Sequence, residues 1–308
     1  MARIGAFHLQ QSALLNLQRA QGRELAAAET VATGRKANDL KGFGRASESV
    51  TALRTVQARV ETWQAQADAL AGKLELQDAQ LTETLDAAGD FRTALQEALA
   101  MDRSDGLTTR VTAAFHKAAG ALNGKHQGQY LFGGGRLEER PFAANELSQR
   151  TTVPAAANLF SNDDLKSSTR LDDGVVIQSG QLASEFGGEL METFRRFQAF
   201  LESPDGALDK NLTTAQRTFI ETEMANLARV QTDITAVVSR NGMAQSQVAS
   251  AMASLEDRAI SLKTLLATRT EVDLAQAVSE LQQAQISVEA TAKVYSTLKG
   301  SSLLDLLR

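Results

Sequence analysis

The sequence predicts a mainly α-helical fold: an elongated antiparallel bundle of long helices, with a coiled coil formed by both chain ends and a small β-containing insert domain in the middle. Three observations favour this class. Aromatic residues make up 5% of the 308 residues and prolines number 3, a composition that suits long helices. Apolar residues recur at steps of three and four near both ends. All three prolines fall between residues 130 and 210.

Residues 1–44 are expected to form a coiled-coil arm and a turn. From Phe7 onward a weak apolar stripe includes Leu14, Leu17 and Leu25, and these side chains are predicted to form an assembly seam. The helix is expected to end at Thr33–Gly34, because glycine suits the left-handed position that follows a helix.

Residues 45–129 are expected to form the first half of a helical rod domain. Apolar residues at steps of three or four predict one helix from about residue 46 to residue 101. At about 1.5 Å per residue this helix would be about 80 Å long. A compact chain of this length has a radius of gyration of about 20 Å, so an elongated molecule is expected. A second helix is predicted to begin at Leu107.

Residues 130–210 are expected to form a mixed or β insert domain, because short β-type pieces such as 174–177 occur there. Residues 211–268 are expected to form the second half of the rod domain. Its helix is predicted to begin near Thr213, which suits the N-cap position.

Residues 269–308 are expected to form the C-terminal coiled-coil arm. Thr268–Glu271 fits a capping box that would begin the helix, and Gly300 would end it. The predicted assembly seam contains Leu274, Leu281, Val288, Tyr295 and Leu298, followed by Leu303 and Leu304. Because many of the alternating positions are Ala or Thr, the arm is expected to become fully ordered only inside an assembly.

Several function classes are disfavoured. The absence of cysteine excludes thiol catalysis and cysteine-ligated metals, and the three histidines lack metal-ligand spacing. No catalytic residue, cofactor site or metal site is predicted, and the chain is not expected to be an enzyme. The net charge of -5 argues against nucleic acid as a partner. No membrane span and no cleaved signal peptide are expected.

Three stretches resemble the flagellin superfamily. They are the turn Thr33–Asn38, the joint Ser239–Ala244 and the start of the C-terminal arm, Glu271–Ala277. Within that superfamily, residues 128–134 (GQYLFGG) are similar to a signature of hook-associated proteins, carried here by Gly128, Tyr130, Leu131, Phe132 and Gly134.

This resemblance implies a structural subunit of the bacterial flagellum that joins hook to filament. It implies an extracellular location after type III export without a cleaved signal peptide. The implied partners are copies of the chain in a helical or ring assembly, a neighbouring hook-associated protein, flagellin and an export chaperone. The alternatives are a filament flagellin, major or minor, and a cytosolic coiled-coil scaffold.

Overall fold

The computed structural model describes residues 2–150, 155–208 and 211–306, with side chains over residues 8–148, 155–208 and 211–300. The fold is mainly helical, which confirms the predicted class, and divides into two compact units. One unit contains residues 1–60 and 257–308, and the other contains residues 61–256. The long helices α2 (Ser47–Met101) and α5 (Thr214–Thr270) contribute to both units. Within the described ranges, no helix combines the length and hydropathy of a membrane span.

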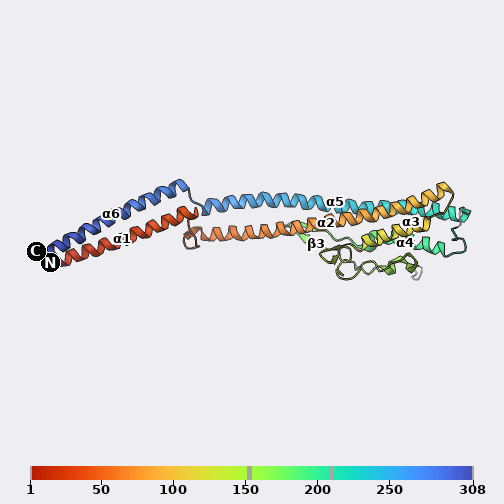
Figure 1. The fold of residues 1–308 in the computed structure, drawn as a ribbon, viewed down its shortest axis with the longest axis horizontal. Helices are drawn as coiled ribbons and strands as arrows, with labels where there is room; N and C mark the ends of the chain where they lie inside the picture. Colours follow the sequence, from red (N-terminus) through yellow and green to blue (C-terminus); the bar gives the residue numbers. More distant parts are fainter. Residues whose placement is uncertain (1, 151–154, 209–210, 307–308) are drawn as a thin grey trace. The chain divides into compact units, whose positions relative to one another are not determined.

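In the first unit, helices α1 (Ala2–Thr33) and α6 (Leu274–Leu306) lie side by side (Figure 1). The one-turn helix η1 (Gly44–Ala46) connects the turn after α1 to α2. Helix α6 continues through Gly300, so the predicted helix end at that glycine is wrong. A single interior glycine costs a helix only about 1 kcal/mol, and no proline follows it here.

The predicted start of the C-terminal helix is also wrong. Helix α5 continues to Thr270, and the hydroxyl of Thr268 donates to the carbonyl of Thr264 one turn earlier, at 2.9 Å, as expected inside a helix. The N-cap of α6 is Asp273, whose carboxylate accepts the backbone N–H of Ala275 at 2.8 Å. Thr213, in contrast, forms the predicted cap of α5: its Oγ1 accepts the N–H of Gln216 at 3.2 Å.

The second unit is built around phenylalanines. Phe91 of α2 stacks on Phe194, with ring centroids 4.6 Å apart, and Phe115 meets the same ring edge-on at 5.6 Å. Phe115 comes from α3 (Leu107–Leu122), and Phe194 comes from α4 (Ala183–Leu201). All three rings are fully buried. Side chains of residues 130–210 therefore share one core with the long helices.

Helix α4 is an element that the sequence reasoning missed. Its buried side chains recur with helical spacing. The prolines and the short β-type pieces had led to a mixed or β interpretation of the whole stretch 130–210. Gly187 is needed because an added Cβ would lie 2.5 Å from the side chain of Leu122 on α3. The glycine thus lets α4 pack closely against α3.

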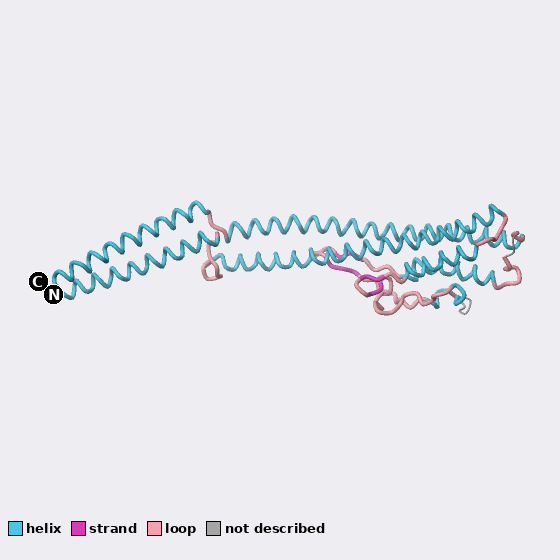
Figure 2. Tube along the Cα trace, in the orientation of Figure 1, coloured by secondary structure: helices cyan, strands magenta, loops and turns pink. Residues whose placement is uncertain are grey.

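The strands are short and form two antiparallel pairs (Figure 2). Strands β1 (Lys125–His126) and β2 (Gln129–Tyr130) form one hairpin, and β3 (Ser168–Arg170) and β4 (Val176–Gln178) form the other. The single-turn helices η2 (Leu147–Arg150) and η3 (Ala156–Leu159) contact α4. The β-type piece predicted at 174–177 corresponds to β4. Its Ile177 packs into a second apolar cluster between α2 and α5.

A polar layer separates the two apolar clusters of this unit. Along α2, Gln77 lies between Leu74 of one cluster and Leu81 of the other. Asn241 likewise lies between residues of the two clusters along α5. Both amides are fully buried. The Nδ2 of Asn241 donates to the carbonyl of Leu74 at 3.0 Å and to Asp78 at 3.2 Å. These bonds favour one register of α5 against α2, because shifting either helix by one turn would leave the buried Nδ2 of Asn241 unpaired.

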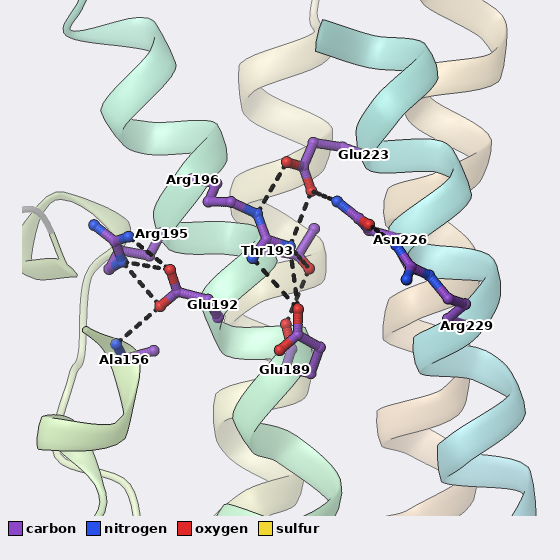
Figure 3. A network of polar contacts seen from close by, with 9 residues as sticks. All are labelled: Ala156, Glu189, Glu192, Thr193, Arg195, Arg196, Glu223, Asn226 and Arg229. Atoms are coloured by element: carbon purple, nitrogen blue, oxygen red, sulfur yellow. Dashed lines mark hydrogen bonds and ion pairs between the residues drawn. The ribbon is translucent and has the colours of Figure 1, made fainter.

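A second polar network joins α4 to α5 (Figure 3). The guanidinium of Arg196 donates from Nε to Glu223 at 2.9 Å, and Glu223 is almost completely buried on α5. Arg196 also contacts Glu189 and Thr193 of its own helix. The neighbouring Arg195 instead binds Glu192, whose Oε2 accepts the N–H of Ala156. Arg196 therefore links two helices, whereas Arg195 orders the loop beside α4.

We predict that Arg196→Met lowers the free energy of unfolding by about 3 kcal/mol, because Glu223 would remain as a buried carboxylate without its cation. The matched variant Arg195→Met should lower it by about 1 kcal/mol or less, because that pair is partly solvated. Urea titrations followed by circular dichroism measure both changes. Equal losses of unfolding free energy in the two variants would contradict the different roles assigned to Arg196 and Arg195.

We also predict that Gln77→Met raises the free energy of unfolding by about 1 kcal/mol. Neither the Nε2 nor the Oε1 of Gln77 has a hydrogen-bond partner among the described residues, and methionine has a similar shape without the desolvated amide. The same urea titration tests this, with Asn241→Ala as the comparison that should instead be destabilised. A loss of stability in Gln77→Met would show that the amide is needed.

Candidate assembly surface

The contact face of α6 carries most of the predicted C-terminal seam. Ala277 is buried, while Leu281, Val288, Tyr295 and Leu298 are half-buried along the stripe that packs on α1. Leu274, the first predicted seam residue, is 56% exposed, because it lies in the first turn of the helix. Leu303 and Leu304 lie outside the residues whose side chains are described. The assembly role of all these residues remains a prediction.

The contact face of α1 differs from the predicted stripe. Ala13 and Ala20 are buried and Leu17 is half-buried, whereas Leu14 is 39% exposed and Leu25 is 73% exposed. The residues facing α6 follow a heptad pattern of small side chains that includes Ala13, Ala20 and Ala27. Two of the predicted leucines, Leu14 and Leu25, lie off this stripe; Leu14 lies about 100° around the helix from Ala13. The seven-residue spacing of the alanines was the signal that could have located the contact.

A backbone clamp closes one end of this helix pair. The N–H of Lys36 donates to the carbonyl of Thr270 at 2.8 Å, and the N–H of Val272 donates to Gly34 at 3.0 Å. Arg35 and Glu271 form an isolated antiparallel bridge between these bonds. Gly34 has φ +65°, which glycine adopts without strain. Two of the three family-like stretches therefore meet here, and they set the antiparallel register of α1 against α6.

The residues of the 128–134 signature connect α3 to the rest of the second unit. Gly128 has φ +84° in the turn between β1 and β2, and the Nζ of Lys125 lies 4.3 Å from the ring centroid of Tyr130. Leu131 and Phe132 are buried, and the Phe132 ring packs edge-on against Phe186 of α4 at 4.9 Å. The signature thus anchors the chain in the phenylalanine core directly after the hairpin.

The glycines that end the signature allow a close backbone approach. Gly134 has φ +69°, and a Cβ there would lie 2.2 Å from the Oδ1 of Asp163. That carboxylate accepts the backbone N–H of Gly135 at 2.7 Å and the N–H of Leu165 at 3.0 Å. These two hydrogen bonds lower the pKa of Asp163. Asp163 therefore ties the glycine run to the loop before β3.

Exposed large apolar side chains are concentrated in the first unit. Most of the exposed large apolar side chains among the described residues belong to the first unit, although the second unit contains the greater part of the chain. Such side chains mark surfaces that bind other molecules when they are grouped. Those of the first unit are Leu9, Leu14, Leu15, Leu25, Leu40, Ile260, Leu265, Leu274, Val278, Ile286 and Val294.

A groove runs along one side of the α1·α6 pair and has a volume of about 380 Å³. Apolar side chains of both helices line it, with Leu9 and Ala13 on α1 and Val294 and Leu298 on α6. The sequence reasoning named only Leu298 among these. Within the described residues, no group of three or more histidine, aspartate or glutamate side chains is placed to hold a metal ion.

Comparisons with known proteins agree with this architecture. A putative flagellar hook-associated protein from Vibrio parahaemolyticus aligns over 73% of this chain and 97% of its own, with a TM-score of 0.61 and 12% identity. The fold is that of flagellar hook-associated proteins. FlgL from Bacillus cereus aligns over 70% of this chain and 99% of its own, with a TM-score of 0.57 and 14% identity. No family model matches the sequence, and no curated protein matches it. The hook-associated fold is thus recognised by structure, at identities too low to carry a function.

We predict that Gly134→Ala is more destabilising than Gly128→Ala. Both positions have positive φ, which costs about 1–2 kcal/mol for an alanine. Gly128 has open space where the Cβ would be, whereas at Gly134 the new methyl group would displace Asp163 and break its two backbone hydrogen bonds. Thermal unfolding of the two variants measures the difference. Equal melting temperatures would show that the close approach to Asp163 has no energetic importance.

Proposed function

We propose that this chain is a structural subunit of the bacterial flagellum that joins the hook to the filament. The observation that carries the proposal is the α1·α6 pair, which has a narrow contact rich in alanine and an excess of exposed apolar side chains. A buried methyl group contributes about 0.8 kcal/mol, and the larger side chains of the contact are only half-buried, so the contact supplies little of the free energy needed to order two long helices. Packing against further copies would supply the rest.

Several finer features belong to this proposal. The chain would leave the cell through the flagellar type III apparatus without a cleaved signal peptide and would act outside the cell. Its neighbours would be copies of itself in a ring or helix, another hook-associated protein and flagellin. An export chaperone would cover the C-terminal arm before export, because α6 carries exposed Val278, Ile286 and Val294. No catalytic step is proposed.

In this proposal, each segment delimited by the sequence analysis has its own role. Residues 1–44 and 269–308 would be the assembly arms, residues 45–129 and 211–268 the rod domain, and residues 130–210 an outward-facing insert. The hook-associated fold of solved structures that align over most of their own length supports a flagellar role. The signature at 128–134 favours the junction over the filament.

Immunogold labelling of detached flagella with an antibody against residues 155–205 tests the location. The proposal predicts label at a single place, where hook meets filament. Label along the whole filament would instead identify a filament flagellin. Protein found in the cytosol with no label on flagella would contradict both and favour a cytosolic scaffold.

A variant in the arm tests the assembly role. Leu281→Asp places a charge in the α1·α6 contact, and we expect it to reduce incorporation into flagella at least tenfold while the second unit still unfolds cooperatively. The matched control Ser279→Asp changes an exposed polar residue on the outer side of the same helix, and should leave both the α1·α6 contact and incorporation unchanged. Circular dichroism checks folding, and quantitative blotting of detached flagella measures incorporation. Loss of all helical signal in Leu281→Asp would contradict the proposal that this residue acts in assembly and is not needed for the second unit to fold.

A further inference from the structure

The two sides of the α1·α6 pair differ in chemistry. Measured about the axis of α1 from the buried Ala13, Ser12 lies about 100° in one direction and Leu14 lies about 100° in the other direction. Ser12 and Asn16 line the groove, so Leu14 lies on the opposite side of the pair. Leu25 lies on the same side as Leu14, eleven residues later. On α6, Val278 and Ala292 lie on that side by the same geometry; Leu14, Leu25 and Val278 are exposed, and Ala292 is half-buried.

These two sides are called here the groove side and the ridge side. The groove side is the surface that contains the groove lined by Leu9, Ala13, Val294 and Leu298. The ridge side is the surface with Leu14, Leu25, Val278 and Ala292. The ridge and the groove lie at the same level along the pair, because Leu14 is adjacent in sequence to the groove residue Ala13. A neighbouring copy can therefore present one side to the other with little axial displacement.

The two sides carry charges of opposite sign at one level along the pair. Helical geometry places Arg19 and Arg23 of α1 on the groove side and Glu289 of α6 on the ridge side. The clamp pairs residue 34 with residue 272, which sets Arg19 and Glu289 within about one helical turn of the same level. Within one copy they face opposite sides of the pair and form no ion pair with each other. Across two copies, a ridge in a groove would bring them together.

We propose that the ridge side of one copy packs into the groove side of the next copy, with Leu14 near the Leu9–Val294 groove and Glu289 near Arg19. This contact joins two different surfaces, so it is heterologous and generates a ring or a helix rather than a closed two-fold dimer. The inference rests on the proposed function and specifies which surfaces of the assembly arms meet.

Cysteine cross-linking tests the contact directly, because the natural chain contains no cysteine. Full-length Leu14→Cys and Val294→Cys variants are produced together in the flagellated bacterium, and detached flagella are treated with a short bis-maleimide. The proposal predicts covalent dimers only when both variants are present. Leu15→Cys with Val294→Cys is the matched control. It should give at least tenfold less dimer, because Leu15 faces away from both sides.

A charge exchange gives an independent readout. Arg19→Glu and Glu289→Arg should each lower incorporation several-fold, and the two changes combined in one chain should restore it, since every copy would then carry the reversed pair. A combined variant that assembles no better than the single variants would contradict the proposed pairing.

The outcomes separate this inference from the proposed function. If the chain is present in flagella but the mixed variants give no dimer, the ridge-to-groove contact is wrong and the structural role stands. Dimers formed by Leu14→Cys alone or by Val294→Cys alone would indicate a two-fold contact and also overturn it. Absence of the unaltered chain from flagella would overturn the proposed function and this inference together.

Discussion

The arrangement of the first unit depends on the backbone clamp between residues 34–36 and 270–272. Two main-chain hydrogen bonds, which together form the antiparallel bridge between Arg35 and Glu271, hold the end of α1 beside the start of α6. The clamp fixes the register of two helices whose contact buries alanines fully and larger side chains only in part. Two stretches far apart in the sequence, 34–36 and 270–272, thereby form one structural element.

The two units differ in how they are stabilised. The second unit has a self-sufficient core, where phenylalanines from α2, α3 and α4 stack and the Arg196–Glu223 pair links α4 to α5. The first unit lacks such a core and leaves many apolar side chains exposed. A chain that folds in one part and is completed by neighbours in another is suited to assembly, because the free energy of ordering is coupled to association.

The sequence predicted the helical class and the long helices because their apolar spacing extends over many turns. The sequence-based prediction of individual helices and helix ends was wrong where a local sequence pattern favoured one structure and packing favoured another. Gly300 did not end α6, and Thr268 lies inside a helix although its pattern fits a cap. Helix α4 was missed because the prolines and β-type pieces between residues 130 and 210 favoured a mixed or β interpretation of the whole stretch. Of the seam leucines predicted on α1, Leu17 lies in the contact with α6, whereas Leu14 and Leu25 are exposed and Ala13 and Ala20 are buried in the contact instead.

Hydrogen exchange of the free chain and of the chain in detached flagella tests the central claim, that α1 and α6 are completed by neighbouring copies. In the free chain, backbone amides of residues 8–33 and 274–300 should exchange within minutes, while those around Phe91, Phe115 and Phe194 should be protected for hours. In flagella, the amides of both arms should become as protected as the core. Equal and strong protection of the arms and the core in the free chain would contradict the account.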